Sequence, residues 1–141
     1  MPHRILILAL EVALALAGVA VRADVVAVVS ANSPVTTLTK SEVMDIFLSK
    51  RTHFPDGTSA VPIDQREGSA ARDQFYSVYG SMSAAQIKAF WSRIIFTGRG
   101  QPPKSVSNGE EAKKLVAADP NAIAYIDQSM VDSSVRVVLA P

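Results

Sequence analysis

The chain of 141 residues contains no cysteine. This absence excludes disulfide bonds, thiolate metal sites and a cysteine nucleophile, so the fold must be held by its core alone. Histidine is scarce as well, because the chain has two and only His53 lies beyond the N-terminal apolar run. One loop histidine provides neither a metal-binding pair nor an evident serine–histidine arrangement. Walker-type and dinucleotide-binding glycine motifs are also missing, so no metal and no cofactor is expected.

An excess of charge of one sign is lacking too. The chain has 14 basic and 13 acidic residues and a formal net charge of +1. Residues 1–23 hold two of the basic residues and one of the acidic ones, which leaves twelve of each sign in residues 24–141. A surface without a basic excess argues against nucleic acid as a partner.

One apolar run, residues 5–21, has the length of a targeting segment. It follows Arg4 and ends in small residues before Asp24, where the composition changes. This order is typical of a secretory signal peptide. The sequence therefore predicts a signal peptide over residues 1–23 and one mature domain over residues 24–141, located in the periplasm or outside the cell. An uncleaved N-terminal anchor is the alternative.

Short β-branched runs alternate with amphipathic segments in residues 24–141. The runs predict strands over residues 24–29, 60–64, 122–126 and 135–139. The amphipathic segments predict helices over about residues 40–48, 70–80, 84–95 and 108–118, with a short turn at 128–131. Capping-box patterns begin at Thr39, Ser83 and Ser107. Strands that alternate with helices predict an α/β fold with a largely parallel or mixed sheet.

Two segments between these elements have a marked pattern. The third helix is the most strongly amphipathic, with an apolar face made of Ile87, Phe90, Trp91, Ile94 and Ile95. We expect this face to pack on the core. Residues 97–103 hold two glycines and two prolines and are predicted to form a constrained loop.

Residues 60–75 combine an apolar strand, a polar turn and the start of a helix. Ser69 is the predicted N-cap, because its hydroxyl can accept a hydrogen bond from a first-turn N–H. Free N–H groups and the positive end of the helix dipole at such a start favour an anion, and Arg66 and Arg72 add charged donors. The stretch therefore predicts an oxyanion site, and an ordinary strand-to-helix connection with solvated arginines is the alternative.

Two other loops are rich in donors. One follows the first strand and contains Ser33, Thr36 and Thr37, and the other covers residues 97–99. Because ligands of open α/β sheets bind outside the carboxyl ends of the strands, we expect the loops after the first and second strands to converge on one site. Plain solvation of each loop is the alternative.

Three segments resemble phosphate-type periplasmic substrate-binding proteins. Residues 38–50, LTKSEVMDIFLSK, resemble the family's LTxxEvxdIFlGK segment. Residues 65–75 are similar to its phosphate loop, R-x-D-G-S-G-T-x-x-x-F, and residues 119–126, DPNAIAYI, resemble its xPGAIGYV strand. The three matches come in the family's order and span most of residues 24–141.

This resemblance implies a short, single-lobe member with the α/β, three-layer fold of a type II periplasmic-binding-protein lobe and a mixed, mostly parallel sheet. It implies a phosphate-like oxyanion as ligand. The donor-rich loops and the resemblance together predict as ligand-binding residues Gly68, Ser69, Ala70, Ala71, Arg66, Arg72, Ser33, Thr36 and Thr37. Of these, Gly68 and Ser69 match the family's loop directly. The sequence departs from the family's loop at Gln65, which aligns with the arginine, and at Ala70 and Ala71, which align with the final Gly-Thr.

The favoured function is an exported solute-binding module that resembles the substrate-binding component of a phosphate ABC transporter. Such a module performs no chemistry on phosphate or a similar oxyanion, and its partner is a membrane transporter or an envelope protein. A different class of function is an interaction or sensory module of a cell-envelope complex that binds no solute. A hydrolase that acts on an anion is the third hypothesis.

Overall fold

A computed structural model describes residues 24–141, and the predicted signal peptide, residues 1–23, lies outside the described residues. The strands are β1 (Val25–Ser30), β2 (Val61–Gln65), β3 (Lys104–Val106), β4 (Ala122–Asp127) and β5 (Val135–Leu139). The helices are α1 (Lys40–Phe47), α2 (Ala70–Gly80), α3 (Ala84–Thr97), α4 (Gly109–Ala118) and the 3-10 helix η1 (Gln128–Met130). Every predicted strand and helix is present, and β3 was not predicted.

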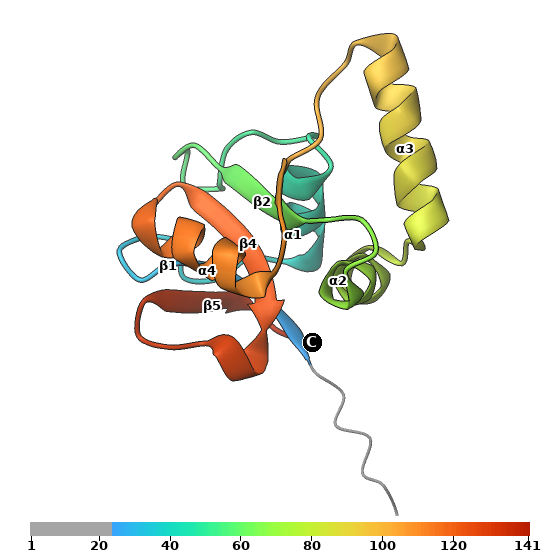
Figure 1. The fold of residues 1–141 in the computed structure, drawn as a ribbon. Coiled ribbons are helices and arrows are strands. Elements are labelled where there is room, and N and C mark those ends of the chain that lie inside the picture. Colours follow the sequence, from blue (N-terminus) through green and yellow to red (C-terminus); the bar gives the residue numbers. More distant parts are fainter. Residues whose placement is uncertain (1–23) are drawn as a thin grey trace, which may run out of the picture.

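The strands form one mixed sheet in the order β3-β2-β4-β1-β5 (Figure 1). β2 pairs in parallel with β3 and β4, whereas β1 pairs antiparallel with β4 and β5. The predicted mixed sheet is confirmed, but it is not mostly parallel as expected: the described strands make parallel and antiparallel pairings in equal number, because β1 runs against both of its neighbours. Because β1 runs opposite to β2, the carboxyl ends of these two strands lie at opposite edges of the sheet.

Helices cover both faces of the sheet, so the expected three-layer α/β arrangement is confirmed. On one face, Phe47 of α1 and Phe75 of α2 pack on the sheet, and Phe75 stacks on Tyr125 of β4 with ring centroids 4.0 Å apart. On the other face, Ala112 and Val116 of α4 pack on β1, β2 and β4. Full burial of an aromatic or branched side chain contributes about 1.5–3 kcal/mol each, so these two clusters provide the main stabilisation of the fold.

Two of the three predicted capping boxes are confirmed. Thr39 caps α1 with Glu42 as its partner, and Ser83 caps α3 with Gln86. The third is wrong by one residue, because the N-cap of α4 is Asn108. Its side chain accepts a hydrogen bond from the N–H of Glu111 at 3.0 Å, while the Glu111 carboxylate accepts one from the N–H of Ser107.

Helix α3 extends away from the sheet (Figure 1). Its predicted apolar face packs on the core through the buried Ile87 and Trp91, with Phe90 and Ile94 half-buried. The prediction for Ile95 is wrong, because its side chain is 58% exposed. The C-terminal turn of α3 therefore lies beyond the layer that covers the sheet.

Candidate functional site

The polar turn between β2 and α2 contains a glycine with positive φ. The N–H of Ser69 donates to the carbonyl of Arg66 at 3.1 Å, and Gly68 between them has a φ of +87°. A side chain at this position would strain the backbone, so glycine fits the turn. The Ser69 hydroxyl accepts a hydrogen bond from the N–H of Arg72 at 3.3 Å. Ser69 is therefore the N-cap of α2, as predicted.

The start of α2 presents backbone donors to solvent. In residues 24–141, no hydrogen-bond acceptor is found for the N–H groups of Gly68, Ala70 and Ala71. Gly68 and Ala70 are exposed, and Ser69 and Ala71 are half-buried. The free amides and the positive end of the helix dipole coincide here, which is the arrangement that favours an anion at a helix start.

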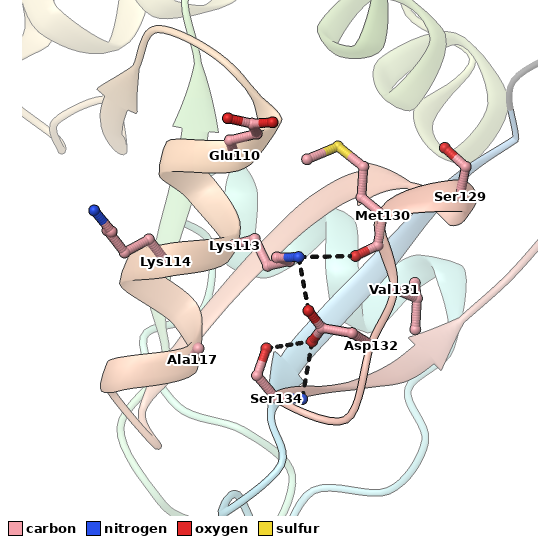
Figure 2. Close-up of a pocket in the computed structure, with 9 residues that line it drawn as sticks. All are labelled: Glu110, Lys113, Lys114, Ala117, Ser129, Met130, Val131, Asp132 and Ser134. Atoms are coloured by element: carbon pink, nitrogen blue, oxygen red, sulfur yellow. Dashed lines mark hydrogen bonds and ion pairs between the residues drawn. The ribbon is translucent and has the colours of Figure 1, made fainter.

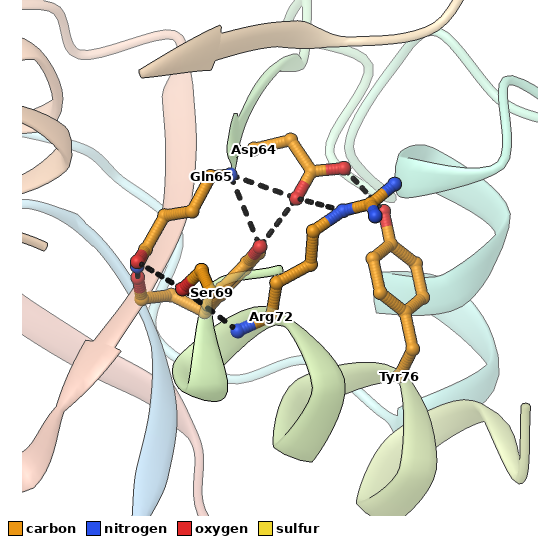
Figure 3. A network of polar contacts seen from close by, with 6 residues as sticks. Asp64, Gln65, Ser69, Arg72 and Tyr76 are labelled. Atoms are coloured by element: carbon orange, nitrogen blue, oxygen red, sulfur yellow. Dashed lines mark hydrogen bonds and ion pairs between the residues drawn. The ribbon is translucent and has the colours of Figure 1, made fainter. Parts of the chain in front are cut away.

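The Ser69 hydroxyl proton is already used within the fold. It is donated to Oε1 of Gln65 at 3.1 Å, and Nε2 of Gln65 donates to the carbonyl of Tyr125 at 3.0 Å (Figure 3). Gln65 is buried, so this chain of hydrogen bonds ties the turn to β4. Ser69 can therefore donate to a ligand only by giving up its bond to Gln65.

The Arg72 side chain points away from the helix start and toward Asp64 of β2 (Figure 3). Its Nε lies 3.6 Å from Oδ1 of Asp64, and the guanidinium lies over the Tyr76 ring at 5.5 Å from the centroid. The Arg72 side chain is 13% exposed and the Asp64 side chain 5%. From the sequence we expected Arg72 to add a charged donor at the turn. In the structure its guanidinium instead compensates the buried carboxylate of Asp64.

The Asp64 carboxylate is the centre of a buried polar cluster, defined here as Asp64, Arg72, Tyr76 and Tyr125. Tyr76 donates its hydroxyl proton to Oδ2 at 2.6 Å, Tyr125 donates to Oδ1, and the N–H of Gln65 donates to Oδ1 at 2.8 Å. Burial raises the pKa of both tyrosines far above its usual value, and the charge of Asp64 raises it further. The cluster joins β2, β4 and α2 directly beneath the turn.

Arg66 stays exposed beside the turn. Its backbone N–H donates to Val106 of β3 at 2.9 Å, and its Nε donates to the carbonyl of Ser107 at 3.3 Å. Oε1 of the neighbouring Glu67 lies 3.9 Å from Nζ of Lys88. Both side chains are well exposed, so this ion pair contributes little to the stability of the fold. Arg66 is thus better placed than Arg72 to add positive charge near the free amides.

Helix α4 begins at the same edge of the sheet, a feature that we did not predict. β3 runs parallel to β2 and leads into α4, and a Cβ on Gly109 would lie 3.8 Å from Nε2 of Gln65. The first turn of α4 carries Glu110 and Glu111, whose carboxylates disfavour an anion there. The start of α2 is therefore the better anion site of the two.

The loop after β1 does not join this site, so the expected convergence of loops is wrong. Val29 near the end of β1 pairs with Ile123, which pairs with Pro62 at the beginning of β2. The loop with Ser33, Thr36 and Thr37 therefore lies at the opposite edge of the sheet from Ser69. Ser33 is also buried, and its hydroxyl accepts the N–H of Val35 at 3.2 Å. The loop over residues 97–99 continues to Gln101, whose carbonyl accepts the Ser49 hydroxyl at 2.9 Å.

An open hollow of about 660 Å³ lies between α4 and the segment that joins β4 to β5 (Figure 2). Nζ of Lys113 donates to the carbonyl of Met130 at 3.2 Å and to Asp132 at 2.8 Å, and Ser134 also donates to Asp132. These bonds hold the pKa of Asp132 well below its usual range. Because Lys113 and Asp132 bind each other, this hollow is a weaker candidate than the α2 start.

Two kinds of feature are absent from the described residues. Within residues 24–141, no group of histidine, aspartate and glutamate side chains is arranged to hold a metal ion. The same residues contain no helix that is both long and apolar enough to cross a bilayer.

Comparison with known proteins gives matches at the level of structure. No protein-family model and no curated protein sequence matches the chain. A solved structure assigned as a phosphate ABC transporter substrate-binding protein from Clostridium perfringens, with bound phosphate, matches 82% of this chain at 26% identity and a TM-score of 0.66. An ABC-type phosphate transport receptor from Vibrio cholerae matches 82% of the chain at 21% identity and a TM-score of 0.63.

The chain spans 44% and 45% of the length of these two proteins. The resemblance to phosphate-type substrate-binding proteins is thus confirmed as a structural likeness to less than half of each relative. The α/β fold expected for such a lobe is confirmed as well.

Proposed function

We propose that the chain is an exported solute-binding module that binds phosphate or a similar oxyanion at the start of α2. The observation that carries this proposal is the Gly68–Ser69 turn with its free amides, placed at the carboxyl end of β2 in a fold shared with phosphate-binding relatives. The amides of Gly68, Ala70 and Ala71 would contact the oxyanion, and Arg66 would add positive charge. No chemistry on the ligand is part of this proposal.

The donor set supports modest affinity. Ser69 donates its proton to Gln65, and Arg72 is held at Asp64, so a bound anion must rely mainly on backbone N–H groups. The site also lies open at the edge of one lobe, and an open site leaves charged contacts exposed to water, where they are weaker. A membrane transporter or another envelope protein that covers this edge would strengthen binding by excluding water.

A periplasmic location and a signal peptide over residues 1–23 belong to the same proposal. The named relatives are a phosphate transporter's substrate-binding protein and a transport receptor, which supports an exported transport component with residues 24–141 as its binding domain. The second candidate, an interaction or sensory module that binds no solute, is favoured by one observation. The Ser69 hydroxyl and the Arg72 guanidinium, both expected at the ligand, are engaged within the fold.

Thermal unfolding with phosphate, sulfate, arsenate and chloride at equal ionic strength tests the proposal. A ligand at a hundred times its Kd stabilises the native state by about 2.7 kcal/mol, which is about 10 °C for a domain of this size. We expect phosphate to raise the melting temperature more than chloride does. We expect Arg66→Ala to reduce that increment through the loss of positive charge. We expect Ser69→Ala to reduce it because the cap that holds the turn is lost, not because a donor to the ligand is removed.

Matched variants separate a specific site from general effects. Ser83→Ala removes the equivalent cap of α3, and Lys40→Ala removes a basic residue at the start of α1. Both should keep the full phosphate increment, although Ser83→Ala should lower the melting temperature itself. If phosphate stabilises the protein no more than chloride, oxyanion binding is excluded and the interaction module becomes the better explanation.

A further inference from the structure

The C-terminal end of α3 is the most exposed apolar part of the described chain. The Phe96 side chain is 92% exposed and that of Ile95 58%, whereas Ile87 and Trp91 in the first part of the helix are buried. Figure 1 shows α3 standing beside the body of the protein with this end pointing away from α2. A large aromatic side chain held in water at the end of a projecting helix marks an interaction surface.

The chain on both sides of Phe96 is basic in sequence. No acidic residue occurs between Asp73 and Glu110, whereas this stretch contains Lys88, Arg93, Arg99 and Lys104. Both Arg93 and Arg99, on either side of Phe96 in the chain, are exposed. Of these four residues, Arg93 and Arg99 lie at the C-terminal end of α3, whereas Lys88 lies in its first part, 3.9 Å from Glu67, and Lys104 belongs to β3.

The end of α1 brings two more basic residues to this region. The Ser49 hydroxyl donates to the carbonyl of Gln101 at 2.9 Å, and a Cβ on Gly100 would lie 3.6 Å from Cβ of Ser49. Lys50 and Arg51 follow Ser49 directly and are exposed. The acidic residue close to them on α1 is Asp45, whose carbonyl accepts the N–H groups of both. We name Lys50, Arg51, Arg93, Ile95, Phe96 and Arg99 together the arm tip.

We propose that the arm tip docks the protein on an anionic lipid surface. Phe96 and Ile95 enter the interface between headgroups and acyl chains, and the four basic side chains contact the phosphate groups. Residues 98–101 and Ile95 border an open hollow of about 410 Å³, which gives a headgroup room beside Arg99. The contact is peripheral and reversible, since two apolar side chains are too few for a permanent anchor.

The positive charge around the exposed aromatic side chain favours an anionic lipid surface as the occupant. A bilayer accepts a projecting aromatic side chain at the level of its headgroups, and positive charge around such a side chain adds attraction to anionic lipid. Phe96 projects from the end of a helix, and the residues around it carry positive charge of the kind that anionic headgroups attract. This surface is independent of the anion site proposed at α2.

Co-sedimentation of the full-length chain with vesicles tests the proposal. One set of vesicles is phosphatidylcholine alone, and the other is an equal mixture of phosphatidylcholine and phosphatidylglycerol. Residues 1–23 contain an apolar run that can bind both sets, so the quantity to measure is the excess of binding to the anionic vesicles. We expect a clear excess for the unmodified chain, and a loss of that excess at high salt.

Two variants and their controls locate the excess. Phe96→Ser should lower it by about tenfold. The double reversal Arg93→Glu with Arg99→Glu should lower it by at least about tenfold. Val61→Ser changes an exposed valine of β2, and Lys40→Glu with Lys114→Glu changes net charge equally outside the arm tip. Both controls should bind as the unmodified chain does.

Circular dichroism confirms that each variant is folded before its binding is compared. Equal binding to the two kinds of vesicle overturns the proposal. So does an excess that Phe96→Ser leaves unchanged or that the controls reduce as much as the arm-tip variants. If the arm tip is instead a surface for an acidic protein, lipid vesicles will show no anionic excess, and this result also overturns the proposal.

Discussion

Asp64→Asn is the sharpest test of the buried polar cluster. The substitution keeps the size of the side chain and removes its charge. Asp64 accepts hydrogen bonds from Tyr76, Tyr125 and the N–H of Gln65, and its carboxylate lies 3.6 Å from Nε of Arg72. With asparagine, the Arg72 guanidinium stays largely buried without a carboxylate beside it. The new amide NH₂ group is a donor, and it faces the hydroxyl and N–H groups that donated to the Asp64 carboxylate.

The expected loss follows from these contacts. Removing one partner of a buried ion pair costs about 3–5 kcal/mol, because the remaining charge is left uncompensated. Arg72 retains some exposure, which relieves part of this cost, so we expect about 3 kcal/mol. For a domain of this size the melting temperature should fall by about 10–15 °C. Urea unfolding should show a lower midpoint with an unchanged slope.

A double-mutant cycle identifies the cause. If the uncompensated guanidinium dominates, Asp64→Asn with Arg72→Gln should be more stable than the sum of the two single effects predicts, by at least about 1 kcal/mol. Arg51→Gln, at an exposed arginine, is a control outside the cluster. A loss below about 1 kcal/mol for Asp64→Asn, or additive effects in the cycle, would refute the argument that a buried charge pair braces β2 against α2.

Three other changes have expected outcomes. Gly68→Ala should destabilise the protein by about 1 kcal/mol in urea unfolding, because φ at this position is +87°. No atom lies within 4 Å of the added methyl group, so no packing contact offsets the backbone strain. An unchanged midpoint would show that the turn relaxes. Burial raises the pKa of each of the three tyrosines, and it raises the pKa of Tyr79 to about 12. Tyrosinate absorbance should therefore stay low in the folded protein up to about pH 11. The unfolded chain ionises near pH 10, so stability should be complete below that pH and fall as the pH rises further; early tyrosinate absorbance in the native state would contradict the burial. Tyr76→Phe should cost about 1.5–3 kcal/mol, since Asp64 loses a donor, and an effect equal to that of Tyr79→Phe would argue against a special role of the charge.

The parts of the fold that sequence predicted well depend on neighbours in the chain. Ser69 as the cap of α2 follows from a turn glycine, a hydroxyl and an amphipathic segment within a few residues. The cap of α4 was misplaced because Val106 still belongs to β3, a strand of three residues that is too short to show a pattern. Once β3 is recognised, its parallel pairing with β2 accounts for the start of α4 at the same edge.

Features that depend on strand direction or packing could not be predicted in this way. Nothing in the residues of β1 indicates that it runs opposite to β2, and this direction alone removes Ser33, Thr36 and Thr37 from the site. Arg72 and Asp64 were both visible in the sequence, but their pairing requires α2 to pack across the end of β2. The exposure of Ile95 likewise depends on where α3 leaves the core.

Gln65 links the stability of the turn to its capacity for ligands. In the sequence resemblance to the phosphate loop it takes the place of an arginine, and in the structure it is buried with both ends of its amide engaged, at Ser69 and at Tyr125. An arginine side chain there would add positive charge to the site. The glutamine instead accepts the hydroxyl proton of Ser69, which is then not free to bind a ligand. Binding at the α2 start would then depend on amides and on Arg66, groups that respond to negative charge more than to the shape of the anion. Phosphate and sulfate should therefore bind with similar affinity, and a strong preference for phosphate would require a donor or acceptor supplied by a partner protein.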